Sequence, residues 1–257
     1  MTRALLWLMA VVLAVALTVL VFLPAAWLGP LVERQTGGRL TLGDAQGTLW
    51  RGAAFIGGAP GPGGVVTPLL PGRFAWRLSP LVLLGQVALT LDNPEALTPA
   101  VQVTGSWSDW QVSPAALLLP AEGLSGLGAP LNTLAPSGLM RLSWTSLNLQ
   151  REARTVAVNG RTTLTMTDMG SRMAPIKPLG SYELTMDWRG PQAGLNLSTL
   201  RGALLLSGTG SLDNGRFQFS GQAAAADGYE ETLGNLLNLM GQRRMVNGKN
   251  IIALEFK

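Results

Sequence analysis

Apolar residues at every second position recur along most of this chain, and this pattern constrains the fold more than any other feature. The clearest segments are RFAWRLS (73–79), QVALTLD (86–92), LMRLSWT (139–145) and SYELTMDWR (181–189). Because successive side chains of a strand point to opposite faces, each segment forms a strand with one apolar and one polar face. The segments follow one another at short intervals, which favours antiparallel meanders over βαβ units. We therefore predict a mainly β fold with one or two curved antiparallel sheets.

Turns and a few short helices are expected between these strands. The dipeptides Asn159-Gly160 and Asn214-Gly215 tolerate positive φ and are predicted to form hairpin turns. Short helices are expected near 80–84 and 114–119, where a Ser-Pro pair supplies a capping residue followed by proline at the first helical position. A third helix is expected over 230–241, where leucines recur at helical spacing.

Glycine and proline, present as 32 and 16 residues, concentrate in two breaks of the strand pattern. Residues 57–72 are expected to form a loop or a sharply turned crossing. Residues 121–138 are the best candidate boundary between two β layers or subdomains, and their leucines indicate that this stretch packs on the domain. Such long breaks favour bends and crossings over a compact closed barrel.

The N-terminal segment is a long apolar run without charge. Ala4 to Leu23 has Thr18 as its only clearly polar residue, and about 20 helical residues span the ~30 Å hydrocarbon core of a bilayer. A cleaved signal peptide is the alternative, but its apolar core is usually only about 7–15 residues long. Pro24 would also occupy a position where cleavage needs a small residue. We therefore predict a retained transmembrane anchor over residues 4–23.

The charge flanking this run predicts its orientation. Arg3 precedes it, and positive flanks stay on the cytoplasmic side of a membrane. Residues 1–3 are thus expected in the cytoplasm and residues 24–257 across the membrane, which in a bacterium means an inner-membrane protein with a periplasmic domain. Trp7 and Trp27 bracket the run as interfacial aromatic residues do.

The composition argues against an enzyme. The chain has no histidine and no cysteine, which removes Ser/His/Asp and Cys/His catalysis and thiolate metal sites. The remaining candidate carboxylates mostly lie in turn-like contexts where Asp serves local hydrogen bonding, and they are Asp92, Asp109, Asp168, Asp187 and Asp213. No phosphate-binding loop is present. We expect no catalytic site, no metal and no cofactor.

The charge pattern argues against nucleic-acid binding. The formal net charge is only +4, and the basic residues are spread along the chain without a cluster. The tryptophans Trp107 and Trp110 in GSWSDWQ are not two residues apart, so they cannot share one strand face without a bulge. We therefore consider the hypothesis that one of these two side chains is exposed for contact with a partner.

One stretch carries a family resemblance. Thr41 to Ala54 reads TLGDAQGTLWRGAA, and its G-T-L-W-x-G-x-A core resembles protein N of the bacterial type II secretion system, the general secretion pathway protein N family. The resemblance extends to a W-x-L-S-P-x-x-L-L segment at 76–84 and to a closing leucine-rich helix. The motif residues are Gly47, Thr48, Leu49, Trp50 and Gly52. We interpret them as a fold-defining hairpin around a buried ring.

The resemblance implies an inner-membrane accessory subunit of a machine that exports folded proteins across the outer membrane. Such a subunit would associate with the inner-membrane components C, L and M or with the outer-membrane secretin. Exposed sheet edges would offer a contact mode, because strand addition satisfies unpaired backbone groups. A lipid-handling β-groove of the AsmA type, which could bind phospholipid, is the alternative function. A pilus-type biogenesis subunit would differ mainly in its partner.

Overall fold

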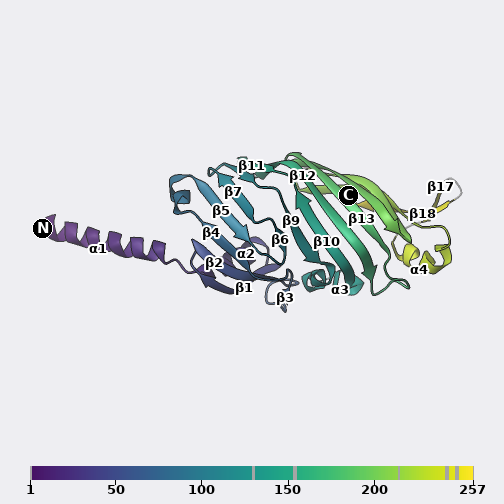
Figure 1. The fold of residues 1–257 in the computed structure, drawn as a ribbon, viewed down its shortest axis with the longest axis horizontal. Helices are drawn as coiled ribbons and strands as arrows, with labels where there is room; N and C mark the ends of the chain where they lie inside the picture. The colour runs from purple at the N-terminus through teal and green to yellow at the C-terminus, as the bar shows by residue number, and fades with distance from the viewer. Residues whose placement is uncertain are drawn as a thin grey trace.

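The computed structural model describes residues 2–128, 131–152, 155–213, 215–240, 243–246 and 249–256. Over these residues, eighteen strands form one open sheet in which every pairing is antiparallel. Figure 1 shows an elongated, twisted and curved sheet, with one helix projecting from the end where the chain starts. The prediction of a mainly β fold with a curved antiparallel sheet and a few short helices is confirmed.

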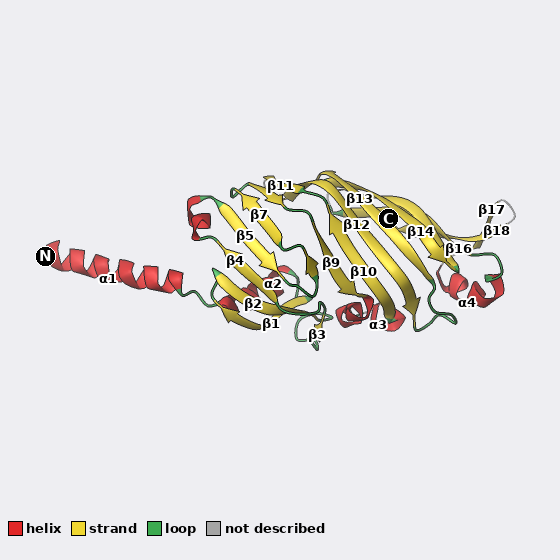
Figure 2. Ribbon diagram, viewed as in Figure 1, coloured by secondary structure: helices red, strands yellow, loops and turns green. Residues whose placement is uncertain are grey.

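The strands follow one another along nearly the whole domain (Figure 2). The first nine are β1 (Leu40–Gly47), β2 (Arg51–Gly58), β3 (Thr67–Pro68), β4 (Phe74–Leu78), β5 (Val87–Asp92), β6 (Leu97–Thr98), β7 (Val101–Gly105), β8 (Asp109–Val112) and β9 (Ala115–Pro120). The others are β10 (Pro136–Trp144), β11 (Leu147–Glu152), β12 (Thr155–Ser171), β13 (Gly180–Gly190), β14 (Gln192–Gly202), β15 (Leu204–Asp213), β16 (Arg216–Ala225), β17 (Arg243–Val246) and β18 (Lys249–Phe256).

The helices are short apart from the first. They are α1 (Thr2–Val21), the 3-10 helix η1 (Ala25–Trp27), α2 (Leu28–Gln35), the 3-10 helices η2 (Pro80–Leu84) and η3 (Ala121–Leu127), α3 (Leu131–Leu134) and α4 (Glu230–Met240).

The pairing order makes one sheet out of both halves of the chain. From β1 it runs through β2, β4, β5, β7, β8 and β11 to the long strand β12. Strand β12 also pairs with β10, which pairs with β9, so the strands before and after the break at 121–138 are joined directly. Beyond β12 a meander continues through β16, and β18 and β17 complete it.

The two faces of the central part of the sheet differ in chemistry. One register line joins six leucines on adjacent strands, which we call the leucine row: Leu97, Leu117, Leu142, Leu164, Leu184 and Leu197. The neighbouring register line, on the other face, joins Ser143, Thr163, Thr185, Asn196, Thr209, Ser220 and Glu255. Over these strands, the alternation in sequence thus places an apolar line on one face and a polar line on the other, which we call the apolar and the polar face.

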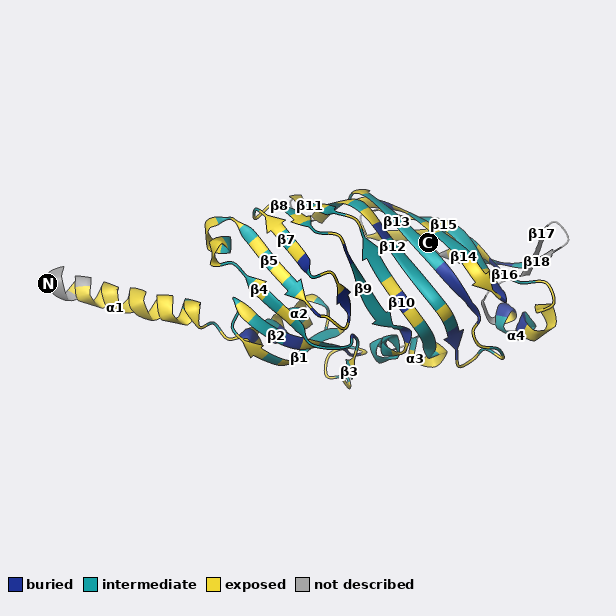
Figure 3. Ribbon diagram, viewed as in Figure 1, coloured by how far each residue is buried: buried dark blue, intermediate teal, exposed yellow. Residues whose placement is uncertain are grey.

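Short helices pack on the sheet at several places. Helix α4 packs on β16 and β18, where its Leu233 is fully buried against Ala223 and Ile252. The 3-10 helix η3 packs on β9 and β10, so the leucines of the 121–138 break do contact the domain, as expected. Between these points the leucine row is half-buried, apart from the buried Leu97 (Figure 3).

Two of the three expected helices are confirmed and one prediction is wrong. Ser79 caps η2 by accepting a hydrogen bond from the Leu81 amide at 3.3 Å, and α4 forms over Glu230–Met240. Of residues 114–119, however, 115–119 form most of strand β9, and Pro114 directly precedes it. Here the Ser113 hydroxyl accepts from the amide of Gln102 at 2.9 Å, so it serves a neighbouring strand instead of a helix N-terminus.

The two predicted turns also differ in outcome. Asp213 pairs with Arg216, so a hairpin joins β15 to β16 as expected, although Asn214 itself lies outside the described residues. The prediction of a turn at Asn159-Gly160 is wrong, because both residues lie inside β12. At Gly160 the strand passes close to the turn between β10 and β11, and an added Cβ would lie 2.9 Å from the Ser146 carbonyl oxygen. Glycine is needed there for a close approach and not for a turn.

The N-terminal run forms helix α1, which leaves the domain as a separate rod (Figure 1). Its described large apolar side chains, apart from the half-buried Leu20, are exposed, with 59% at Leu5 near its start and 50% at Val21 at its end (Figure 3). Within the described part of the chain, no helix is long and apolar enough to qualify as a membrane span.

Candidate functional site at the junction of helix and sheet

The family-like motif forms the turn between β1 and β2. Gly47 ends β1 with φ +86°, a conformation that side chains other than glycine rarely adopt. A Cβ on Gly47 would also lie 2.4 Å from the carbonyl oxygen of Arg51. At Gly52 a Cβ would lie 2.4 Å from Cζ2 of Trp76, so the indole of that residue lies directly on the glycine. Both glycines are therefore required by close approaches.

This turn contacts the C-terminal end of α1 through three consecutive residues. The Trp50 indole Nε1 donates to the Leu20 carbonyl oxygen at 2.8 Å. The Leu49 amide donates to the Leu23 carbonyl oxygen at 2.8 Å, and Thr48 forms an isolated β-bridge with Pro24. Carbonyls in the last turn of a helix have no partner within the helix. The motif supplies a partner to one of them and holds the segment that follows.

The same turn is fixed to the sheet on its other side. The Trp76 indole Nε1 on β4 donates to the Leu49 carbonyl oxygen at 3.0 Å. The amide of Leu78, at the end of β4, donates to the Trp50 carbonyl oxygen at 2.8 Å. The motif is thus a rigid connector, with α1 on one side and the sheet on the other.

An ion pair stabilises the adjoining part of β1. A bulge between Gly43 and Gln46 places Asp44 at φ 47°, where its carboxylate accepts from the side chains of Gln46 and Arg73. These two partners lower the pKa of Asp44, and the Gln46 hydrogen bond is the larger cause. The Arg73 guanidinium also lies 4.5 Å from the centre of the Phe55 ring. Asp44 is exposed and Arg73 is half-buried, so the pair is open to solvent on one side and orders the bulge locally.

The junction offers positioning and no proton transfer. Its functional atoms are backbone carbonyls, backbone amides and indole N–H groups, which neither titrate near neutral pH nor act as nucleophiles. Over the described residues, no group of three acidic side chains lies close enough together to hold a metal ion. What the arrangement does is set the position of α1 relative to the sheet.

The two tryptophans that were candidates for partner contact differ in exposure. Trp110 is half-buried on β8, opposite Gly105 and Leu149. Trp107 lies in the turn between β7 and β8 with 59% of its surface exposed, and its indole Nε1 donates to the Val82 carbonyl oxygen of η2 at 2.6 Å. The structure thus leaves Trp107 as the exposed member of the pair, and partner contact by it stays a prediction.

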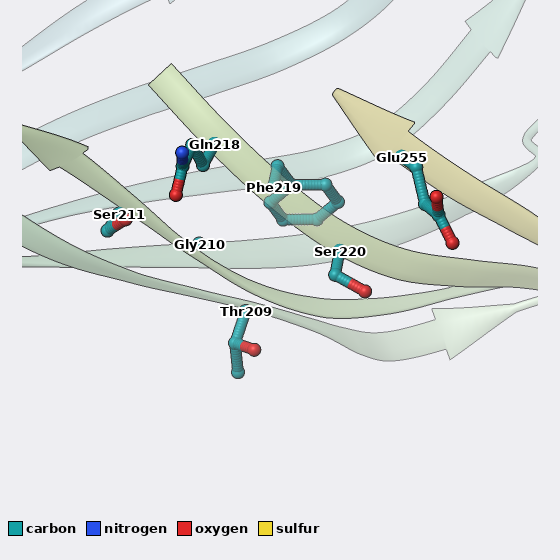
Figure 4. Close-up of a pocket in the computed structure, with 7 residues that line it drawn as sticks. All are labelled: Thr209, Gly210, Ser211, Gln218, Phe219, Ser220 and Glu255. Carbon is teal, nitrogen blue, oxygen red and sulfur yellow. The ribbon is translucent and has the colours of Figure 1, made fainter. Parts of the chain in front are cut away.

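A separate hollow lies at the far end of the sheet. It has a volume of about 510 Å³ and is lined by Thr209, Gly210, Ser211, Gln218, Phe219, Ser220 and Glu255 (Figure 4). Most of these groups are hydroxyls and amides of the polar face. The ring of Phe219 lies close to the backbone of Gly208 and Gly221, where added Cβ atoms would meet it at 2.5 and 2.6 Å. Sequence reasoning did not predict this hollow, because its residues come together only through pairing of β15, β16 and β18.

Sequence reasoning also missed the contact between Trp50 and α1. Two signals in the sequence could have indicated this contact. A tryptophan directly precedes the second strand, and the helix before it ends on carbonyls that need a donor.

Comparison with known proteins identifies the family. No curated protein and no solved structure matches this chain. The model of one protein family matches residues 38–250, a range that contains the whole Gly47–Gly52 motif and nearly all of the sheet. Since this match covers most of the chain, the chain belongs to the family described as type II secretion system (T2SS), protein N.

Proposed function

We propose that this chain is a non-catalytic accessory subunit of the type II secretion system, and that α1 holds its β domain at the periplasmic face of the inner membrane. Membership of the protein N family supports a role in type II secretion. The observation that carries the proposal is the junction, where Trp50 and Leu49 bind backbone carbonyls of the α1 end and of the segment after it. A rigid connector of this kind suits a domain that must present a fixed surface to other subunits.

The chemistry of α1 supports its place in the membrane. Apart from Thr18, its described exposed side chains are apolar, including Trp7 at 75% exposure, and they contact little of the domain. Exposed apolar surface on this scale is stable only against lipid or another apolar surface. With Arg3 on the cytoplasmic side, the sheet would lie in the periplasm.

The sheet edges support contact with the other bitopic components or the secretin. In the described part of the chain β1 pairs only with β2 and β17 only with β18, so both strands have an edge available for strand addition. The β1 edge lies next to the junction and therefore keeps a defined distance from α1.

Gene deletion and complementation test this role. We expect a deletion strain to lose export of folded substrates, and the full-length chain to restore it and to co-purify with components C, L or M. Sodium carbonate extraction of the membrane fraction then reports how α1 is held. Unchanged export together with no co-purification would contradict the proposal.

The apolar face favours one second candidate, an AsmA-like groove that binds lipid. Five of the six leucines in the leucine row are half-buried and form a continuous apolar line across adjacent strands. Native mass spectrometry of the gently purified chain tests it, with Leu184→Arg as the variant and Thr185→Arg, on the opposite face, as the matched control. Stoichiometric phospholipid that is lost only in Leu184→Arg would support the groove, and absence of lipid from the unmodified chain would exclude it.

A further inference from the structure

A small apolar projection stands out at the α1 end of the domain. It consists of Leu81, Leu83 and Leu84 on η2 together with Trp107, and we call it the η2 knob. The exposed fractions are 48%, 49%, 80% and 59% in that order, and η2 has no buried residue. Four large apolar side chains exposed together do not contribute to the core, so they need another explanation.

The knob is held in place by defined hydrogen bonds. Ser79 caps the start of η2, and Gly85 ends it in the left-handed region with φ 92°. Trp107 reaches η2 from the turn after β7 through its 2.6 Å bond to Val82. The leucines are therefore presented by an ordered turn, which lowers the entropy cost of binding through them.

A short chain of contacts connects the knob to the end of α1. Trp50 donates to Leu20 of α1 through its indole and accepts from the Leu78 amide through its carbonyl. Leu78 lies two residues before the first residue of η2. Figure 1 shows the short helix between β4 and β5 at the end of the domain from which α1 leaves, extending in the direction of α1. In this view, η2 and the C-terminal end of α1 thus lie at the same end of the domain.

Two exposed arginines lie on β2 and β4 near the knob, and one exposed carboxylate, Asp109, lies two residues after Trp107, where it accepts hydrogen bonds from neighbouring serine hydroxyls. Arg51 and Arg77 are direct cross-strand neighbours on β2 and β4, and both are exposed. Among the described residues neither guanidinium takes part in an ion pair, although like charges directly opposite each other are unfavourable. Two uncompensated arginines next to exposed leucines and a tryptophan are complementary to an anionic phospholipid surface.

We propose that the η2 knob inserts into the head-group region of the phospholipid bilayer beside α1, with Arg51 and Arg77 facing anionic head groups. This inference rests on the proposed function only in placing α1 at the membrane. A second contact with the bilayer would limit the tilt of the sheet relative to the membrane, which α1 alone would leave to the junction. Tryptophan at the bilayer interface and leucine below it match the known preferences of these side chains.

Single-cysteine labelling tests the proposal, since the chain has no cysteine of its own. The full-length variant Leu84→Cys, labelled with the environment-sensitive dye NBD, is reconstituted into vesicles of phosphatidylethanolamine and phosphatidylglycerol. We expect a blue shift, a several-fold rise in emission and quenching by nitroxide lipids. The matched control is Leu200→Cys on β14, an aliphatic position with 55% exposure far from α1, which should keep a water-like signal.

A third label separates this proposal from the proposed function. Val12→Cys reports whether α1 is in lipid, because Val12 lies on that helix with 60% exposure. A water-like signal at Val12 would overturn membrane attachment itself. A lipid-like signal at Val12 with a water-like signal at Leu84 would overturn the knob proposal alone, as would a Leu84 signal that changes only when other secretion subunits are added.

The charge component has its own test. In the Leu84→Cys background, Arg51→Gln with Arg77→Gln should reduce nitroxide quenching at residue 84 in vesicles that contain phosphatidylglycerol. The same double substitution should have little effect in vesicles of phosphatidylcholine alone. Equal quenching with and without the arginines in both lipids would overturn the part assigned to Arg51 and Arg77.

Discussion

The Trp50 indole donates a 2.8 Å hydrogen bond to the carbonyl oxygen of Leu20, a residue 30 positions earlier in the last turn of α1. The last carbonyls of a helix have no amide donor within the helix, and a donor from elsewhere in the chain satisfies them. The most recognisable residue of the family-like motif thus completes the end of the helix that precedes it. The motif joins α1 to the sheet, and its turn places Trp50 where it can make this contact.

Replacing Trp50 tests the junction directly. In Trp50→Phe the ring remains but the N–H donor is lost, so the Leu20 carbonyl loses its partner at a cost of about 1 kcal/mol. We expect a lower free energy of unfolding by denaturant in detergent. We also expect several-fold faster chymotrypsin cleavage after Phe22 or Trp27, which are 68% and 65% exposed next to the junction.

Trp188→Phe is the matched control for this prediction. It removes the 3.0 Å bond from the Trp188 indole to the Thr162 hydroxyl, which lies in the middle of the sheet. Its unfolding free energy should also fall, but cleavage at the junction should keep the rate of the unmodified chain. Equal cleavage rates in both variants would mean that Trp50 does not hold the helix end.

Gly52→Ala tests the close approach inside the motif. The added methyl would lie 2.4 Å from Cζ2 of Trp76 and 2.7 Å from the Gln46 carbonyl oxygen, so the sheet must shift to accept it. We expect a loss of about 1–3 kcal/mol in denaturant unfolding. Gly194→Ala on β14 is the control, because its added Cβ meets no atom within 4 Å. That variant should be neutral or slightly more stable, since alanine restricts the unfolded chain, and an equal loss in both variants would contradict the steric argument.

The fold followed largely from the alternation of apolar residues, because period two identifies strands whatever their partners are. The family assignment also followed from sequence, through Gly47 to Gly52, and the match over residues 38–250 confirms it. The sequence alone did not predict which strands pair with one another. Residues 114–119 carry a helix start signal, yet β9 forms there because β6 and β10 provide backbone partners on both sides. A capping residue stabilises a helix by about 1 kcal/mol, which is less than the stabilisation from the full set of backbone hydrogen bonds that β9 forms with its neighbours.

The sequence predicted which residues belong to the site but not which atoms they contact. Sequence indicated that Trp50 and the two glycines matter, but the acceptor of the indole hydrogen bond is set by where α1 ends relative to β2. In the same way, Arg51 and Arg77 are unremarkable in sequence and become neighbours only through the register of β2 with β4. Long-range register is the information that local patterns lack.

Tyr182 provides a pH-dependent test of the core. It is 4% exposed, its hydroxyl donates to the Leu204 carbonyl oxygen at 3.0 Å, and burial raises its pKa to about 12. The unfolded chain binds this proton with a pKa of about 10. The folded state therefore holds the proton more tightly, so the stabilisation is complete below pH about 10 and is lost as the pH rises toward about 12.

Absorbance titration measures this shift without overlap. The chain has only two tyrosines, so Tyr229→Phe leaves Tyr182 as the single phenol, and its phenolate band should appear with a midpoint near 12. The variant Tyr182→Phe should lose part of its stability at neutral pH, about 1 kcal/mol for the hydrogen bond. Its stability should also depend less on pH between about 10 and 12. A phenolate midpoint near 10 in the folded protein would contradict the burial argument.

Helix α4 is predicted to hold the end of the sheet through one side chain. Leu233 is fully buried and packs with Ala223 of β16 and Ile252 of β18 in an apolar cluster of described residues. Leu233→Ala removes most of that packing and leaves a cavity, which should cost about 2–5 kcal/mol. The loss should appear in denaturant unfolding and as faster amide exchange in β18. Leu200→Ala, at 55% exposure, is the control and should change the unfolding free energy by no more than about 0.5 kcal/mol. If Leu233→Ala behaved like this control, α4 would not be part of the core and the end of the sheet would depend on strand pairing alone.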